Sequence, residues 1–446
     1  MTATDTTMAI PTAGGGKPDP LDMRNYGLEK LKEIEAGPWM ERFKYIGVPL
    51  GILVFLYFQL RWCGSIEMFD MAKDLPKGVK IGHLYSVAGI FFATLVLWIS
   101  EAIPSYITSF LVVVATILLG ILPMRPAFAY MGEPVMILNI ASFILASALV
   151  VTGLAKRLAL AIVIKWGSNL SGIFWAFIVL NIVLGAFISA TSAKTALLLP
   201  LFMVISAMYG AFGGALRNNV GRNLVLQNLL ANNVSASAFL TGSAANLVAA
   251  MLLEKAGFPV SYQAWLLALL PLSILQCGFA WYTGTKLIFP ISKEDAVPHL
   301  QGGMEHLQLE LDKLGKMSSN EWRAALVFIA VLVMWATGDL HGVRAEVVAM
   351  CGAILVLLPA FSGLRRFGVM NWNQADIPWH MLMFSWGAYV LGGIMEKTKI
   401  VEISTDALFD HIGIDASTPK VYVFIVLAVI FAYTSLINES KTARTI

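Results

Sequence analysis

Charged residues are scarce in this chain. Asp, Glu, Lys and Arg make up 13% of its 446 residues, whereas hydrophobic residues make up 58%. Because soluble domains usually carry about 25% charged residues, this composition excludes an ordinary soluble protein and indicates an all-α polytopic membrane protein. The formal net charge of +3 is too small to indicate nucleic acid as a partner. The lipid bilayer is the partner that the composition predicts.

Cysteine and histidine are also few. The three cysteines, Cys63, Cys277 and Cys351, are far apart and odd in number, which excludes a disulfide framework and a zinc motif. The six histidines are scattered, without the close spacing of metal ligands. Paired acids at metal-ligand spacing and a Gly-x-Ser-x-Gly element in an apolar context are missing too. We therefore expect no enzyme activity, no catalytic residues and no bound cofactor.

The first 44 residues are polar and lack the basic-then-apolar order of a signal peptide. They read as a cytoplasmic tail followed by an amphipathic segment, since basic residues mark the cytoplasmic side. Residues 45–289 form a first transmembrane half, 290–321 a solvated linker with an interfacial helix, and 322–446 a second transmembrane half. We expect a multi-pass protein of the inner, cytoplasmic membrane.

A spanning helix needs about 20 apolar residues, and several runs approach that length. In the first half, helices are predicted at 46–60, 81–100, 106–121, 135–152 and 265–288. Two further apolar blocks are interrupted: 173–208 breaks at a polar hairpin tip, 189–195, and 224–253 breaks at 242–246. Non-helical backbone at membrane depth must line a cavity, so the two breaks predict a polar site. In the second half, helices are predicted at 324–337, 343–361, 381–394 and 421–433, followed by a tip at 437–442.

A short motif occurs at both predicted tips, as SAKTA at 192–196 and ESKTA at 439–443. A lysine at membrane depth costs about 3 kcal/mol or more, so it usually marks a functional site. An alternative is that both lysines reach water or pair with acids. The halves also match at Trp98 and Trp335 and at 151–154 and 397–400. These echoes predict two inverted repeats, each with a re-entrant hairpin and a broken helix.

The chain resembles the divalent anion/sodium symporter family from about residue 81 onward. The resemblance rests on LWISEAIP at 97–104, DKLGKMS at 312–318 and LGGIMEKT at 391–398, with GSAAN at 242–246 as the counterpart of the family's GTPPN element. Members carry dicarboxylates, citrate or sulfate, and the resemblance implies a homodimer. It also implies that hairpin tips and broken helices hold the anion and sodium. The family's Ser-Asn-Thr tips map to Ala-Thr-Ser at 190–192 and Ile-Asn-Glu at 437–439.

From the resemblance and the polar chemistry of these stretches, we expect two sets of site residues. The substrate set comprises hydroxyls, amides and the two lysines: Thr191, Ser192, Lys194, Thr195, Ser243, Asn246, Asn438, Ser440, Lys441 and Thr442. If sodium is the coupling ion, its ligands are expected among Ser189, Thr191, Gly242 and Asn438. A lysine ammonium brings one positive charge without an ion gradient, so the lysine pair instead predicts a sodium-independent transporter, with an exchanger as one form of it.

The leading hypothesis is a secondary transporter of a small dicarboxylate such as succinate, malate or 2-oxoglutarate, with Lys in place of a bound cation. The alternatives are a sodium-coupled sulfate or citrate symporter, or an inactive truncated paralogue or sensor. The last alternative arises because the first half continues for about 90 residues beyond its motif, whereas only three residues follow the second. On that reading the second repeat is incomplete and this form transports poorly.

Overall fold

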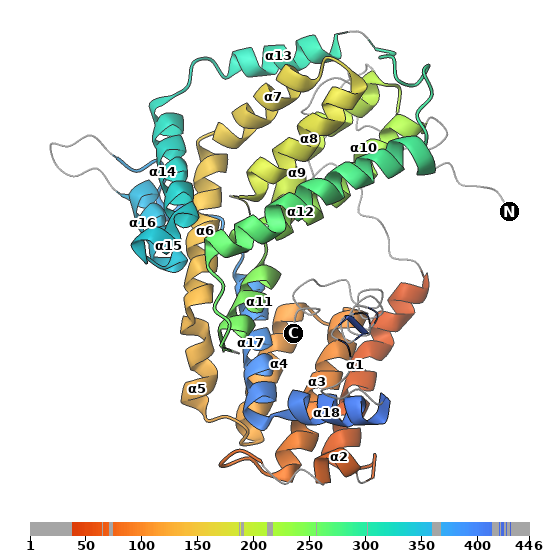
Figure 1. Ribbon diagram of the computed structural model, residues 1–446, viewed down its shortest axis with the longest axis vertical. Coiled ribbons are helices and arrows are strands. Elements are labelled where there is room, and N and C mark those ends of the chain that lie inside the picture. Colours follow the sequence, from red (N-terminus) through yellow and green to blue (C-terminus); the bar gives the residue numbers. More distant parts are fainter. Residues whose placement is uncertain are drawn as a thin grey trace. The chain divides into compact units, whose positions relative to one another are not determined.

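Every regular element in the described part of the chain is a helix, which confirms the all-α membrane fold (Figure 1). The structure is a computed structural model, and it describes residues 38–64, 66–70, 75–186, 188, 191–211, 217–255, 257–300, 302–358 and 367–412, with 419, 421, 422, 425 and 429. These residues fall into two compact units. The larger unit is Leu138–Ile377, and the smaller unit joins Ile34–Ile137 to Pro378–Ile446 where these are described. Each unit therefore draws on both halves of the sequence.

The smaller unit is held by two pairs of helices, α1 on α3 and α4 on α17. Its elements are α1 (Pro38–Gln59), α2 (Glu67–Asp70), α3 (Ile81–Ser100), α4 (Ser105–Leu118), α5 (Met124–Ala129), η3 (Tyr130–Gly132), α17 (Trp379–Thr398) and α18 (Ile400–Ile412). Gly387 lets α17 approach α4 closely, because a Cβ there would collide with Ser109. The Ser109 hydroxyl donates to the Phe384 carbonyl at 3.1 Å, and the Lys397 ammonium donates to the Ile121 carbonyl at 2.7 Å. These contacts join segments some 275 residues apart.

The larger unit contains the two interrupted blocks. Its elements are α6 (Pro134–Val151, continuous with the smaller unit), α7 (Leu154–Trp166), α8 (Leu170–Gly185), α9 (Thr191–Met208), α10 (Asn219–Ala238), η5 (Leu240–Gly242), α11 (Ala244–Lys255), α12 (Tyr262–Tyr282), η6 (Thr283–Ile288), α13 (Gly303–Lys313), α14 (Ser319–Ala336), α15 (Gly338–His341), α16 (Ala345–Leu357) and η7 (Trp372–Gln374). Helices α8, α9 and α12 all pack against α10 (Figure 1). Helix α10 is therefore the centre of this unit.

The described residues include four helical stretches long and apolar enough to cross a membrane. They are Ile81–Ser100, Met124–Val151, Tyr262–Ile288 and Ser319–Ala336. Only 11% of the apolar window in Tyr262–Ile288 is buried inside the structure. Its exposed side chains include Leu267, Leu275 and Phe279, so this helix presents the apolar surface that lipid requires. The helices predicted at 81–100, 106–121, 135–152 and 265–288 appear within three residues of their expected limits, as α3, α4, α6 and α12 with η6. The segment at 421–433 lies largely outside the described residues.

Two local geometries recur in the two halves. The indole Nε1 of Trp98 donates to the Ser105 carbonyl at 3.4 Å, and that of Trp335 donates to the Ala345 carbonyl at 3.0 Å. In each case the acceptor is the first residue of a later helix: Ser105 begins α4, and Ala345 begins α16, which follows the short α15. The Thr152 and Thr398 hydroxyls each donate to the carbonyl four residues earlier at 2.7 Å. Matched local structure at matched sequence positions is what a repeat predicts; the inverted relation of the halves stays a prediction.

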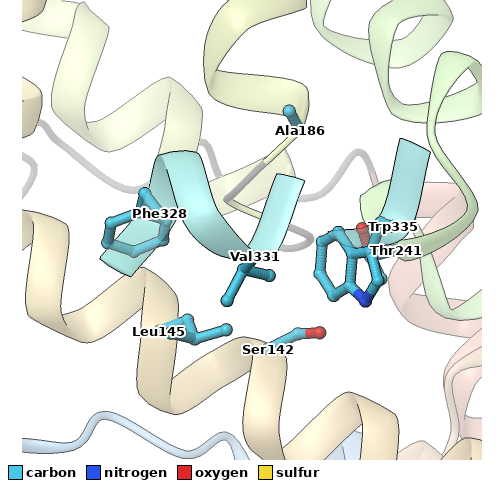
Figure 2. Close-up of a pocket in the computed structure, with 7 residues that line it drawn as sticks. All are labelled: Ser142, Leu145, Ala186, Thr241, Phe328, Val331 and Trp335. Atoms are coloured by element: carbon cyan, nitrogen blue, oxygen red, sulfur yellow. The ribbon is translucent and has the colours of Figure 1, made fainter. Parts of the chain in front are cut away.

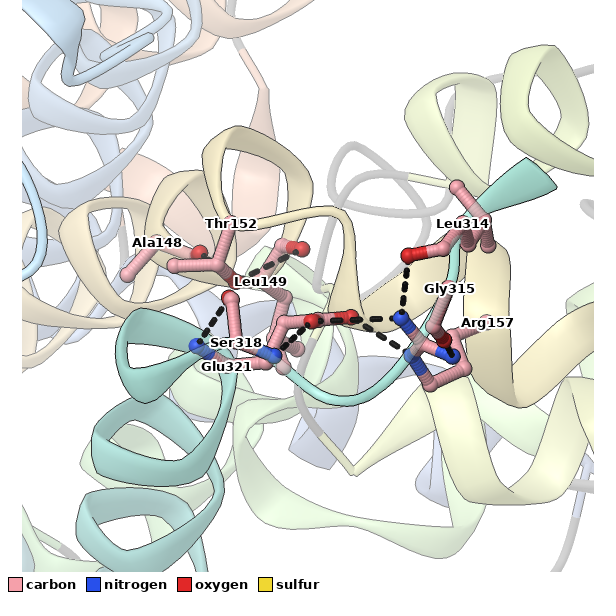
Figure 3. A network of polar contacts seen from close by, with 8 residues as sticks. All are labelled: Ala148, Leu149, Thr152, Arg157, Leu314, Gly315, Ser318 and Glu321. Atoms are coloured by element: carbon pink, nitrogen blue, oxygen red, sulfur yellow. Dashed lines mark hydrogen bonds and ion pairs between the residues drawn. The ribbon is translucent and has the colours of Figure 1, made fainter.

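The linker is tied to the larger unit by Arg157 at the start of α7 (Figure 3). The Arg157 guanidinium binds the Glu321 carboxylate at 2.6 Å and also donates to the carbonyls of Leu314 and Gly315. Glu321 accepts from the Ser318 backbone N–H at 2.6 Å while the Ser318 hydroxyl caps α14. The Glu321 side chain is only 6% exposed, so Arg157 compensates a nearly buried charge. The linker contains a helix, α13; its position at the membrane interface stays a prediction.

Replacing Arg157 by Met should destabilise the protein, because it leaves the Glu321 carboxylate nearly buried without its cation. We expect a loss of about 3 kcal/mol or more in the free energy of unfolding, which is typical of removing one partner of a buried ion pair. Thermal unfolding of the purified protein measures it. Lys165→Met on the same helix is the matched control, since that lysine is exposed and should change stability little. Equal melting temperatures for Arg157→Met and the wild type would contradict this role.

Glu310 on α13 provides a pH-dependent contact with α7. Hydrogen bonds from Lys313 and from Lys156 lower the pKa of Glu310 from its usual 4.5. A carboxylate whose pKa is lower in the folded state stabilises the protein above its ordinary pKa, and this stability is lost as pH falls through the lowered pKa. The difference in melting temperature between the wild type and Glu310→Gln should therefore shrink towards zero as pH falls from neutral to below about 4. A difference that grows on acidification would refute the contact.

Candidate functional site

Two helix breaks meet the end of α10. The first lies between Gly185, the last residue of α8, and Thr191, the first of α9; the second lies between Ala238, the last of α10, and Ala244, the first of α11. Glycine permits this packing, because a Cβ on Gly185 would lie 3.0 Å from the Ser235 carbonyl oxygen and one on Gly242 would collide with that of Ala236. Both breaks are therefore held against the last two turns of α10.

The breaks differ from their predicted limits. Helix α9 already includes Thr191, so the described residues of the SAKTA motif occupy the first helical turns rather than a loop tip. In the second block the non-helical residues are 239–243, and Asn246 lies in the first turns of α11. Polar residues that we assigned to the tips lie at helix starts, where backbone N–H groups need partners; Ser243 accepts from one of them, the Ala245 N–H.

Lys194 is the central residue of the first break. Its side chain is fully buried, with 0% exposed. The ammonium Nζ donates to the Asn232 backbone carbonyl and to the Ser235 hydroxyl, both at 3.2 Å. Both acceptors lie in the last two turns of α10, where the helix dipole is negative and stabilises a cation. The ammonium of α9 is thus bound by neutral oxygens on a neighbouring helix.

Asn232 fixes the start of α9 to α10. Its amide Nδ2 donates to the Thr191 carbonyl at 2.8 Å and to the Thr195 hydroxyl at 2.7 Å, and that hydroxyl donates to the Thr191 carbonyl at 3.0 Å. Both N–H groups of the amide are used, which fixes its orientation. The Asn232 Oδ1 atom is buried and has no hydrogen-bond partner among the described residues, although Asn232 is only 3% exposed.

Asn246 holds the second break closed. Its Nδ2 donates to the carbonyls of Ala236 at 2.7 Å and Phe239 at 2.8 Å, and the Trp265 indole donates to the Ser237 carbonyl at 3.0 Å. These bonds satisfy carbonyls that a helix end leaves without partners. Because both amide N–H groups of Asn246 are engaged, they could bind an anion only if the break opened. The Ser243 hydroxyl accepts from the Ala245 N–H at 3.3 Å.

Helix α10 carries a stripe of polar side chains that the sequence analysis did not identify. The Asn223 and Gln227 amides donate to carbonyls at the end of α12 and beyond η6, including Phe289 and Ala280, and Asn181 donates to the Asn228 side chain at 2.9 Å. Asn232 and Ser235 continue the stripe to the breaks. The available signal was the recurrence of Asn and Gln about every four residues in α10, at 219, 223 and 227 and again at 228 and 232. This stripe is what holds the interrupted helices to α10.

The electrostatics of this region are one-sided. Between residues 134 and 253 the sequence contains no Asp or Glu, whereas its basic residues are Lys156, Arg157, Lys165, Lys194, Arg217 and Arg222. The breaks also place the starts of α9 and α11 near one end of α10, and a helix start favours an anion. The arrangement therefore suits a negatively charged ligand.

A small pocket borders the same breaks on another side (Figure 2). It is lined by Ser142, Leu145, Ala186, Thr241, Phe328, Val331 and Trp335, and its empty volume is about 230 Å³ including space open to solvent. None of these side chains is charged. The pocket's hydroxyl-bearing side chains are Ser142 and Thr241.

The structure brings together some of the expected site residues. Thr191, Lys194 and Thr195 meet at α10, and Gly242, Ser243 and Asn246 form the second break beside the same helix. The Ser192 side chain, Ser189, Asn438, Ser440, Lys441 and Thr442 lie outside the described residues. All of these site assignments stay predictions. Asn232 and Ser235 are two further candidate residues, because they contact Lys194 and Thr191.

Comparison with known proteins points to one family. The sequence profile described as "Sodium:sulfate symporter transmembrane region" matches residues 73–446. A relative named "Membrane protein" in Cupriavidus necator is 27% identical over 396 residues, covering 84% of this chain and 74% of its own length. The Sodium-dependent dicarboxylate transporter SdcS of Staphylococcus aureus, strain USA300, is also 27% identical over 387 residues, covering 83% of this chain and 70% of its own.

Substituting Gly242 by Ala should disrupt the second break, because the new Cβ has no room beside the Ala236 carbonyl oxygen. Overpacking should lower the free energy of unfolding by roughly 1–3 kcal/mol, so we expect the melting temperature to fall. We also expect binding at the break to be lost. Gly82→Ala is the matched control, since a Cβ at that helical glycine meets nothing within 4 Å. If Gly242→Ala behaved like Gly82→Ala in thermal unfolding, the close packing of the break would be disproved.

Proposed function

The chain belongs to the sodium:sulfate symporter family, and from this premise we propose that it carries a small dicarboxylate, such as succinate, malate or 2-oxoglutarate, across the cytoplasmic membrane. Membership in this family makes it a secondary transporter of divalent anions rather than an enzyme. A dicarboxylate is favoured because the relatives named SdcS are described as dicarboxylate transporters. A homodimer in the inner membrane is part of the same proposal.

The anion would be recognised at the two helix starts. A dianion entering the membrane must recover its hydration energy from the protein, and backbone N–H groups at the starts of α9 and α11 can supply hydrogen bonds in a favourable dipole. Thr191 and Ser243 lie at these starts and add hydroxyls. The second half would contribute the matching groups of its own motif, Asn438, Ser440, Lys441 and Thr442.

Lys194 carries the proposal that this transporter works without sodium. Its fully buried ammonium is bound by a backbone carbonyl and a hydroxyl, which are the neutral oxygens that coordinate sodium in transporters with broken helices. The lysine thus supplies at this position the charge that a coupling ion would bring. Supporting this, the tip departs from the family's Ser-Asn-Thr pattern, and no acidic residue lies between 134 and 253.

Two built-in lysines favour exchange over net transport. Lys194 and Lys441 would balance the two charges of a dicarboxylate, so the loaded carrier would bury little net charge. Without cargo neither ammonium group would have a counter-anion at membrane depth, although Lys194 keeps its oxygen partners on α10, and a lysine at that depth costs about 3 kcal/mol. A barrier higher by that amount slows a step by more than about a hundredfold. The empty carrier would therefore return slowly, and cargo would be needed on both sides.

Sulfate is the second candidate cargo, because the description of the family profile names it. Sulfate also carries two negative charges but presents them within one small tetrahedral group, whereas a dicarboxylate separates them. Helix starts at two separate breaks fit two separated carboxylates better. Competition of unlabelled succinate and sulfate against labelled succinate distinguishes the two, and stronger inhibition by sulfate would favour the second candidate.

Uptake of labelled succinate into proteoliposomes tests the proposal. With unlabelled succinate inside, the uptake rate should be similar when choline replaces sodium. Vesicles without internal succinate should take up label at least about tenfold more slowly, because the empty carrier returns slowly.

Lys194→Gln should lower exchange by a similar or larger factor, while Lys165→Gln, at an exposed lysine, should leave it unchanged. A strict requirement for sodium in the wild type would end the proposal.

A further inference from the structure

We propose that the end of the α12–η6 helix and the start of α10 bind the headgroup of an anionic phospholipid. The residues concerned are three exposed cations, Arg217, Arg222 and Lys286, which we call the α10–η6 basic surface. The group that they would recognise is a phosphate that carries a net negative charge and is joined to an apolar chain. Lipid binding at this surface is separate from cargo transport and is expected whatever the cargo.

The start of α10 is bonded to the residues that follow η6. The Asn219 amide donates to the Pro290 carbonyl at 2.8 Å. The Arg222 guanidinium donates to Asn219 Oδ1 at 3.0 Å, and its Cζ atom lies 5.6 Å from the centroid of the Phe289 ring. Arg222 is therefore held over the end of η6, and Lys286 lies in the last turn of that helix.

The α10–η6 basic surface has few acids to neutralise it. None of its three cations makes an ion pair with another described residue. Between residues 134 and 293 the sequence contains one acid, Glu254, which has its own cation partner at the start of α16. Glu294 and Asp295 come next, beside Lys293, so the neighbouring sequence keeps an excess of positive charge.

An exposed apolar stripe on α12 leads to Lys286. Leu275, Phe279 and Tyr282 are each more than half exposed, and their spacing of four and then three residues places them on one face of the helix. A tyrosine between apolar residues and a basic residue is typical of the membrane–water interface. A phospholipid has the same order, an apolar chain followed by a charged head. The stripe and the α10–η6 basic surface together therefore fit a lipid better than a soluble anion.

The chemistry of the three cations favours an anionic phosphate head. A guanidinium binds two phosphate oxygens side by side, and basic residues between membrane helices bind anionic lipid heads. Phosphatidylglycerol carries a net negative charge on its phosphate, whereas phosphatidylcholine balances the same phosphate with a cation of its own. The α10–η6 basic surface should therefore select phosphatidylglycerol.

A lipid bound there would join α10 to α12, which pack side by side (Figure 1). The other end of α10 holds the Lys194 ammonium through Asn232 and Ser235. The lipid would thus stabilise the central helix of the larger unit, and its binding should be measurable as an increase in the stability of the folded protein.

Thermal unfolding of the delipidated protein in detergent, with added phosphatidylglycerol or phosphatidylcholine, tests the proposal. Phosphatidylglycerol should raise the melting temperature by roughly 2 °C or more, because it binds the folded state only, and phosphatidylcholine should raise it much less. Added salt should weaken the response, since the charges are exposed. sn-Glycerol 3-phosphate, which has the phosphate without acyl chains, should give no response.

Substitutions then locate the lipid. Arg222→Gln with Lys286→Gln should raise the phosphatidylglycerol concentration that gives half the response by roughly 25-fold, about fivefold for each basic residue. Lys77→Gln with Lys165→Gln removes the same charge from exposed lysines outside the surface and should leave that concentration unchanged. Lys286→Gln alone keeps the Arg222 contacts, so its fivefold shift is the readout if the double variant folds poorly.

Four results would overturn the lipid site. They are an equal response to the two phospholipids, an unchanged half-response concentration in the double variant and in Lys286→Gln, an equal shift in the Lys77→Gln with Lys165→Gln control, and a response to sn-glycerol 3-phosphate as large as that to phosphatidylglycerol. The last result would indicate a site for a soluble anion instead.

Discussion

The bond between the Lys194 ammonium and the end of α10 is the interaction on which the rest of the site depends. A charge that is fully buried in a membrane protein must be compensated, and here two oxygens of α10 do so at 3.2 Å. That requirement brings the start of α9 to α10, where Asn232 also binds Thr191 and Thr195. This packing requires glycine at 185 and 242, because only glycine lets both broken segments approach the same two turns of α10.

This arrangement separates the cation from the place where an anion would bind. Helix dipoles favour a cation at the end of α10 and anions at the starts of α9 and α11, and all three helix ends lie at the two breaks. Lys194 belongs to α9, and its ammonium binds oxygens of α10. In the proposed mechanism it would offset the charge of the cargo electrostatically, without direct contact with a carboxylate. Under the proposed mechanism an ion gradient would be unnecessary for binding, and the cargo itself would be the counterion of the carrier.

The long apolar helices could be predicted from the sequence, and the contacts of the site could not. Helix α3 matches its expected limits, 81–100, because its apolar run is continuous and ends near Pro104. Helix α18 was missed because acidic residues such as Glu402 interrupt its apolar pattern. Lys194 stood out as a lone charge at membrane depth, but its partners Asn232 and Ser235 are 38 and 41 residues away. Asn and Ser are unremarkable in an apolar segment, and only the fold brings these two to the lysine.

Sodium flux measured together with cargo flux tests the central claim most directly. Proteoliposomes containing the purified protein would receive labelled succinate and radioactive sodium in the same experiment, with succinate inside. If Lys194 replaces a coupling ion, succinate enters and sodium uptake stays at the level of protein-free vesicles. Sodium entering in a fixed ratio to succinate would contradict the account.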